Sequence, residues 1–147
     1  MPDTTPVRVV YLPHCPPGGV SQGSTDASGL DLRTAQPVLL DPGESALVPT
    51  GVQVAIPTGW TGLVCPRSGL ALRHGVSVLN APGVIDPDYR GEVGVLLVNH
   101  GDRAWTAQPG DRVAQLVVVP TLTSWVVEDS LEETDRGGDG WGSTGVE

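Results

Sequence analysis

The densest group of reactive side chains in this sequence lies between Gly83 and Glu92, which read GVIDPDYRGE. Two aspartates, a tyrosine, an arginine and a glutamate fall between two apolar runs. Flanking strands would place this segment on a β-hairpin and project Asp86 into a cleft, where its carboxylate can accept a proton from water. A solvated turn that carries an Asp–Arg pair is the competing interpretation.

Two further clusters hold groups that bind phosphate. Pro66–Ala71 (PRSGLA) places Arg67 and Ser68 at the start of a possible helical turn, where backbone N–H groups attract anions. The alternative is that the serine only caps the helix. Arg136–Gly145 (RGGDGWGSTG) joins flexible glycines and hydrogen-bond donors to Trp141, whose flat face suits a nucleobase. It is not a Walker A loop, because no Gly-Lys-Ser/Thr occurs, and a disordered linker remains the other reading.

Two smaller clusters contain isolated polar side chains in apolar surroundings. Asp31 lies within Ala27–Leu32 (ASGLDL), where an unpaired carboxylate is costly and a metal-bound water would relieve it. Gln115 lies within Gly110–Leu116 (GDRVAQL), at a turn into a strand. An Asx-type turn and a buried amide bonded to the backbone are the respective alternatives.

Charge and composition limit the class of partner. The chain has a net charge of -9, with eight arginines and no lysine, so binding to nucleic acid is not expected. Cys15 and Cys65 stand apart without the spacing of a zinc site. There is neither a signal-peptide pattern nor an apolar run long enough to span a membrane, so we expect a soluble cytoplasmic protein.

The elements that must position these residues are mainly short strands. The 20 glycines and 14 prolines exclude a helical bundle, and valine dominates the apolar residues. We expect an all-β sandwich, jelly roll or barrel over residues 1–127, with one short helix near Ser68–Arg73 and a flexible, acidic, glycine-rich tail over 128–147. Strands are expected at Val7–Leu12, Val38–Leu40, Ser45–Val48, Val52–Ile56, Gly62–Cys65, Ser77–Leu79, Val93–Val98, Arg103–Thr106, Val113–Val119 and Ser124–Glu128.

Taken in chain order, the five clusters resemble the five motifs of the homotrimeric dUTPase family. The matching segments are residues 27–32, 66–71, 83–92, 110–116 and 136–145. The resemblance implies a jelly-roll-like β domain, a homotrimer whose active sites are shared between subunits, and hydrolysis of dUTP to dUMP and pyrophosphate with Mg²⁺. That reaction keeps uracil out of DNA and supplies dUMP for dTTP synthesis.

The resemblance also implies a role for individual residues. Asp86 would activate the attacking water, Tyr89 would lie beneath the deoxyribose and exclude a 2′-hydroxyl, and Asp31 would hold Mg²⁺ through water. Uracil would be read by Asn80, Gly83, Val84 and Ile85. Phosphate contacts would come from Arg67, Ser68, Gly69 and Gln115, and the closing tail would supply Arg136, Trp141, Gly142, Ser143 and Thr144.

Two positions depart from the family pattern. Trp141 stands where phenylalanine is usual, and Leu30 stands where tyrosine is usual. We expect the larger indole still to stack on uracil, and Leu30 to matter less because the neighbouring acid is retained.

Three other functions compete with dUTP hydrolysis. A dCTP deaminase would need a glutamate a few residues beyond the hairpin, but the run Val93–Val98 contains no acid. A nucleotide-sensing regulatory protein on the same scaffold is less consistent with an intact Asp86. A purely structural jelly roll would bind no dUTP.

Overall fold

Short apolar segments separated by turns form three antiparallel sheets in this computed structural model, which describes residues 6–122 and 124–139. A four-stranded sheet has the order β1 (Arg8–Tyr11), β5 (Ser45–Ala55), β9 (Glu92–Asn99), β7 (Val76–Val78). A five-stranded sheet has the order β2 (Ser21–Gln22), β3 (Gly29–Arg33), β11 (Arg112–Pro120), β6 (Trp60–Cys65), β8 (Gly83–Ile85). A two-stranded sheet pairs β10 (Trp105–Ala107) with β4 (Val38–Leu40).

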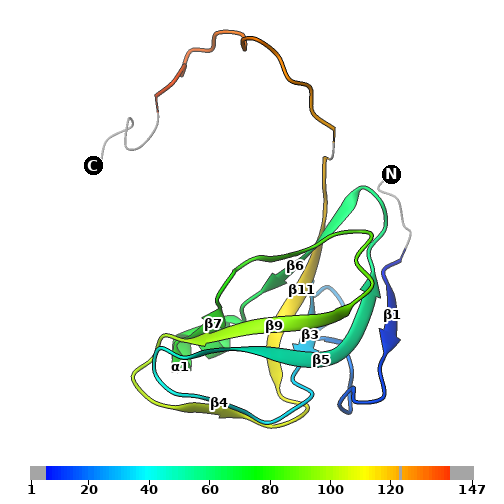
Figure 1. Ribbon diagram of the computed structural model, residues 1–147, viewed down its shortest axis with the longest axis vertical. Helices are drawn as coiled ribbons and strands as arrows, with labels where there is room; N and C mark the ends of the chain where they lie inside the picture. Colours follow the sequence, from blue (N-terminus) through cyan, green and yellow to red (C-terminus); the bar gives the residue numbers. More distant parts are fainter. Residues whose placement is uncertain (1–5, 123, 140–147) are drawn as a thin grey trace.

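Figure 1 shows how the strands are arranged, and one apolar core joins the three sheets. Side chains along a strand point alternately to its two faces, so every second residue reaches this core. Val95 and Leu97 from β9, Leu116 from β11 and Leu40 from β4 are all at most 1% exposed. The expected mostly-β fold with one short helix is therefore confirmed.

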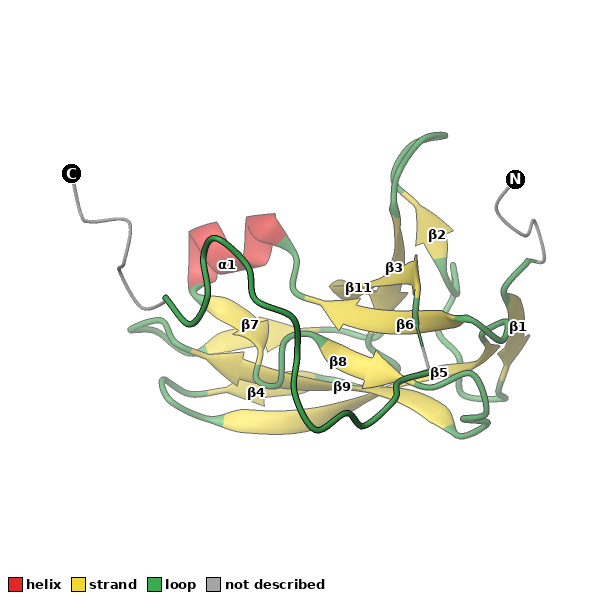
Figure 2. Ribbon diagram, turned by 90° about the horizontal axis from the view of Figure 1, so that it is seen from above, coloured by secondary structure: helices red, strands yellow, loops and turns green. Residues whose placement is uncertain are grey.

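The helix α1 (Ser68–His74) lies outside the sheets, beside β7 (Figure 2). It begins after Arg67, whose backbone is extended, and ends at Gly75, whose φ of 67° is the left-handed conformation that favours glycine. None of its residues is fully buried, but Leu70 packs against the apolar core. The helix begins at the Arg67–Ser68 pair, which is held at this point of the fold.

The strand β5 is longer than the sequence pattern predicts. Ser45–Val48 and Val52–Ile56 were expected as separate strands, but they belong to one strand with an irregularity between Pro49 and Gln53. Three residues of β5 there face Val93 alone. Gly51, at a φ of 69°, makes this bulge possible.

Other differences concern short or unpartnered segments. The strands β2 and β3 were not expected, and β8 was expected only as a flank of the hairpin, without stated bounds. The expected strand Ser124–Glu128 was wrong: no strand occurs among the described residues after β11, and Trp125, Val126 and Val127 are more than 80% exposed. Beyond β11 the chain leaves the body and arcs away from it (Figure 1), so no neighbouring strand can pair with it. The division at residue 127 stays a prediction.

The two cysteines, Cys15 and Cys65, are both free thiols. Among the described residues, no helix has the length and hydropathy to span a membrane.

Candidate active site

Five of the predicted phosphate and metal residues line a single cleft of about 470 Å³, which we call the arginine cleft. They come from three segments that are far apart in the sequence: β3, the start of α1, and β11. The predicted residues that meet there are Asp31, Arg67, Ser68, Gly69 and Gln115. A single chain therefore brings residues of the first, second and fourth motifs together.

Strand register explains why these residues meet. Gln115 on β11 pairs with Asp31 on one side and with Cys65 on the other. Paired residues in antiparallel strands point to the same face, so the amide and the carboxylate share the outer face of the sheet. The next residue along, Leu116, points into the core. Cys65 is followed by Pro66 and Arg67, so β6 delivers the start of α1 to the same place, where Gln115 Nε2 donates to the Pro66 carbonyl over 3.0 Å.

Asp31 is buried in this cleft between two guanidinium groups. Its Oδ1 lies 3.2 Å from Nε of Arg67, and its Oδ2 lies 3.2 Å from Nη1 of Arg112. Arg67 also donates through Nη1 to the Arg112 carbonyl at 3.2 Å. Two positive charges thus face one negative charge, and this part of an acidic protein is formally cationic, as an anion site requires.

Arg112 also lines the arginine cleft, and the sequence analysis did not single it out. It lies inside the fourth cluster, Gly110–Leu116, where only Gln115 was singled out. The sequence did contain a signal for Arg112, because it is the one basic residue of that cluster. Its contact with Asp31, however, spans 81 positions in the sequence and follows only from the pairing of β3 with β11.

The arginine cleft has too few ligands to hold Mg²⁺ by protein side chains alone. Asp31 is its single carboxylate, and the described residues contain no group of three or more His, Cys, Asp or Glu side chains that could hold a metal ion. Mg²⁺ commonly keeps several waters and takes substrate phosphate oxygens in place of a full protein cage. The residues therefore fit Mg²⁺ held by water and phosphate, with Asp31 as the supporting acid.

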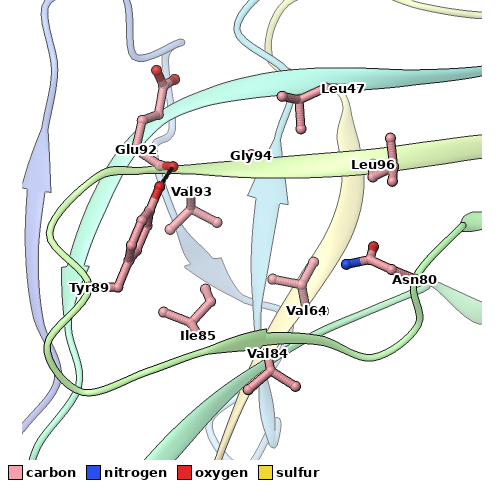
Figure 3. A pocket seen from close by; sticks show the side chains of 11 residues that line it. Leu47, Val64, Asn80, Val84, Ile85, Tyr89, Glu92, Val93, Gly94 and Leu96 are labelled. Atoms are coloured by element: carbon pink, nitrogen blue, oxygen red, sulfur yellow. Dashed lines mark hydrogen bonds between the residues drawn. The ribbon is translucent and has the colours of Figure 1, made fainter.

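The predicted uracil and sugar residues line a second cleft, of about 290 Å³, which we call the hairpin cleft (Figure 3). The edge strand β8 pairs with β6 and brings the third motif to this point. Tyr89 forms one wall, and its hydroxyl donates to the Glu92 carbonyl over 2.8 Å. The predicted residues that line the cleft are Asn80, Gly83, Val84, Ile85 and Tyr89. Its other lining residues, to which the sequence analysis assigned no role in the site, are Leu47, Val64, Glu92, Val93, Gly94 and Leu96.

Asp86 follows β8 directly and lies next to Ile85 of the hairpin cleft without lining it. The residue is exposed, and its carbonyl accepts the Tyr89 amide over 3.2 Å, which closes a tight turn. The carboxylate makes no hydrogen bond or ion pair with another described residue. It is thus free to meet a ligand that arrives from outside this chain's own fold.

The two clefts are lined by different parts of the chain. Residues of β3, β11 and the start of α1 line the arginine cleft, whereas residues of β8 and β9 line most of the hairpin cleft. The clefts share no lining residue. Within one chain, the two sets of predicted site residues therefore lie in separate clefts.

Of the predicted tail residues, Arg136 lies among the described residues. Arg136 is exposed, and its Nε donates to the Asp139 carbonyl over 2.8 Å, within its own turn. It contributes to neither cleft. Trp141, Gly142, Ser143 and Thr144 lie outside the described residues, so their roles stay predictions.

Glu92, the last residue of the third motif, is held by two donors. Its Oε1 accepts the Gly51 amide at 2.7 Å and lies 2.8 Å from Nε2 of His14. Burial by itself would raise the pKa of Glu92, but the hydrogen bonds from His14 and Gly51 outweigh it and bring the pKa below the ordinary value. Burial, and then the nearby Glu92 carboxylate, raises the pKa of the Cys15 thiol.

This lowered pKa predicts a stability difference that depends on pH. A carboxylate with a lowered folded-state pKa stabilises the fold above its ordinary pKa, and the contribution is lost as the pH falls through the folded-state value. The Tm of the Glu92→Gln variant should therefore lie below that of the wild type at pH 7, and the gap should shrink as the pH falls below about 4.5. Thermal melts of both proteins at pH 7 and below pH 4.5 check this. A difference in Tm that stays constant between the two conditions would contradict it.

Comparison with known proteins identifies the family. The dUTPase family model matches residues 20–145. A deoxyuridine 5′-triphosphate nucleotidohydrolase of Anaeromyxobacter sp. (strain Fw109-5) is 55% identical over 148 residues, covering 99% of each chain. The enzyme of the same name from Maricaulis maris is 44% identical over 149 residues, covering 97% of this chain and 98% of the relative.

Solved structures agree with this assignment. The dUTPase of Staphylococcus bacteriophage 80alpha, solved with dUpNHpp, superposes with a TM-score of 0.88 at 27% identity, covering 97% of this chain and 100% of that chain. A dUTPase mutant from phage phi11 of S. aureus, whose structure shows the coordination of a structural Mg(II) ion, has a TM-score of 0.76 at 25% identity, covering 88% and 99%. The chain therefore belongs to the dUTPase family.

Proposed function

We propose that this dUTPase hydrolyses dUTP to dUMP and pyrophosphate with Asp86 as the general base and the arginine cleft as the triphosphate site. The observation that carries the proposal is the gathering of Asp31, Arg67, Ser68, Gly69 and Gln115 in one cationic cleft. The curated relatives that match nearly the full length of the chain carry the corresponding enzyme name.

The arginine cleft binds and orients the phosphates. Arg67 and Arg112 supply guanidinium donors, which suit phosphate oxygens. Ser68 adds a hydroxyl and, with Gly69, backbone N–H groups in the first turn of α1, which have no acceptor within the helix. These donors also meet the charge that develops on the oxygens during attack. Mg²⁺, when held through water by Asp31, would gather the phosphate oxygens and neutralise part of their charge.

The hairpin cleft selects the nucleoside and supplies the base. Backbone groups at Gly83–Ile85 and the Asn80 amide read the uracil edge, and they disfavour cytosine because its 4-amino group is a donor where uracil has an acceptor. The ring of Tyr89 lies beneath the deoxyribose and leaves no room for a 2′-hydroxyl. Asp86, one residue beyond β8, takes the proton of the water that attacks the α-phosphorus.

The complete site requires neighbouring copies of the chain. We propose a homotrimer in which the arginine cleft of one subunit faces the hairpin cleft of another. The separation of the predicted site residues into two clefts with no common lining residue supports this arrangement, as do the exposed apolar side chains Leu47 and Val84 at the hairpin cleft. The tail, with Arg136, Trp141, Gly142, Ser143 and Thr144, would close over the bound nucleotide, stack on uracil and exclude water.

Pyrophosphate release from a panel of nucleotides tests this function. With Mg²⁺ present, dUTP should be hydrolysed, whereas dTTP, dCTP and UTP should react at least about 100-fold more slowly in kcat/KM, because each carries a group that the hairpin cleft does not accommodate. Chelation of the metal should strongly reduce dUTP turnover, and added Mg²⁺ should restore it. Ammonia release from dCTP would instead show a deaminase, and equal turnover of UTP would contradict the role of Tyr89.

A further inference from the structure

The wall of the hairpin cleft formed by Tyr89 depends on the turn that follows it. The Tyr89 hydroxyl donates to the carbonyl of Glu92 over 2.8 Å, so this donor is satisfied within the protein (Figure 3). A Cβ on Gly91 would overlap that hydroxyl, so glycine at 91 leaves room for the ring to lie where it does. The ring is therefore placed by the backbone of residues 91 and 92.

The side chain of Glu92 points away from the ring that its backbone holds, as Figure 3 shows. Its carboxylate lies 2.7 Å from the amide of Gly51 and 2.8 Å from Nε2 of His14. Its side chain is 28% exposed and that of His14 is 51% exposed. Glu92 thus connects the end of the hairpin to two segments that are far away in the sequence.

The bulge of β5 needs this acceptor. Between Pro49 and Gln53 the pairing with β9 is interrupted, so the Gly51 amide has no ladder partner there and takes the Glu92 carboxylate instead. The Gly51 carbonyl accepts the amide of Leu12 over 2.8 Å, which holds the segment after β1 against the bulge. A Cβ at position 51 would overlap the backbone of Cys15, so the approach is as close as glycine permits.

We propose that Glu92 is a positioning residue for the sugar-binding part of the hairpin cleft, with His14 as its outer support. Its backbone carbonyl fixes the Tyr89 ring, while its carboxylate fixes its own backbone to the β5 bulge and to the segment after β1. This inference rests on the proposed function, since it assumes that the Tyr89 ring contacts the deoxyribose. Glu92 thus helps to recognise the sugar and takes no part in proton transfer.

The test compares sugar selectivity in four variants. Glu92→Ala removes both side-chain contacts, and His14→Ala removes one. Glu92→Gln keeps an oxygen that can accept the Gly51 amide. Glu44→Ala is the matched control, because the Glu44 carboxylate also accepts a backbone amide, that of Asp41 at 2.9 Å, in a turn that contributes to neither cleft. For each variant, kcat and KM are measured with dUTP and with UTP, and the Tm is measured separately.

The expected results separate positioning from a general loss of stability. Glu92→Ala should lower the dUTP preference over UTP by about 10-fold, chiefly by raising the KM for dUTP, with kcat changed by less than about 3-fold. His14→Ala should lower the preference by a smaller factor. Glu92→Gln should keep it within about 3-fold of the wild type, and Glu44→Ala should leave it unchanged.

Other outcomes would overturn the proposal. A Glu92→Ala variant with a lower Tm but unchanged sugar preference would show that Glu92 serves stability alone. If that variant does not fold, Glu92→Asp is tested in its place, because its shorter side chain cannot reach Gly51 and His14 as glutamate does. An unchanged preference for dUTP over UTP in Glu92→Asp would also contradict the proposal. A wild type that does not hydrolyse dUTP would instead contradict the proposed function, before the role of Glu92 is reached.

Discussion

Replacement of Asp86 by Asn should reduce kcat for dUTP by about 10²- to 10⁴-fold and leave dUTP binding within a few-fold of the wild type. Asparagine has nearly the same shape but cannot accept the proton of the attacking water. The residue is exposed and its side chain pairs with no other described residue, so the change should not disturb the fold. Turnover by rapid-quench assay and binding of a nonhydrolysable dUTP analogue by calorimetry measure the two effects.

The control for this variant is its neighbour in the same turn. Asp88 is also an exposed aspartate of the third motif, two residues further along. Asp88→Asn should keep most of the activity if the base is Asp86. Near-normal turnover by Asp86→Asn, or an equal loss in both variants, would contradict the assignment.

Two inactive variants should restore activity when they assemble together. Asp86→Asn damages the hairpin half of the site, and Arg67→Ala damages the arginine cleft. In a cyclic trimer whose sites each lie between two neighbouring subunits, every mixed trimer has about a third of its sites with both halves intact. Co-expression with different affinity tags, followed by tandem purification, should give mixed trimers whose activity rises far above that of either variant alone.

The matched control combines two lesions in the same half. Asp86→Asn mixed with Asn80→Ala leaves no site with an intact hairpin cleft, so the activity should not exceed the mean of the two variants. Recovery in this second mixture would argue against shared sites, and so would the lack of recovery in the first. A solution mass that corresponds to a single chain would lead to the same conclusion.

The sequence predicted the strands best where apolar residues are continuous or alternate. Val38–Leu40 was predicted with its observed bounds, and Val93–Val98 lies within β9. β2 and β8 are only two and three residues long, and β3 begins with a glycine, so their existence depends on neighbouring strands and not on local pattern. The apolar run near Trp125 resembles a strand but finds no partner among the described residues.

The candidate site shows a similar limit. The motifs name the residues, and their chain order carries no information about which ones meet. The separation into two clefts depends on the strand order β2-β3-β11-β6-β8, and so does the contact of Arg112 with Asp31. The link from Glu92 to Gly51 and His14 requires a bulge that no residue pattern indicates.

The ion pairs of Asp31 bear on how the enzyme tolerates abundant small anions. The Asp31 carboxylate already occupies both guanidinium groups of the cleft, as an internal substitute for a phosphate group. Free inorganic phosphate must displace this carboxylate from the arginines, and it brings no cation to compensate the charge of the displaced carboxylate. A triphosphate that arrives with Mg²⁺ brings oxygens for the arginines and a cation for the acid, so both partners of each broken pair are compensated. As the proposed triphosphate site, the cleft would thereby favour a metal-bound polyphosphate over simpler anions that are present in excess.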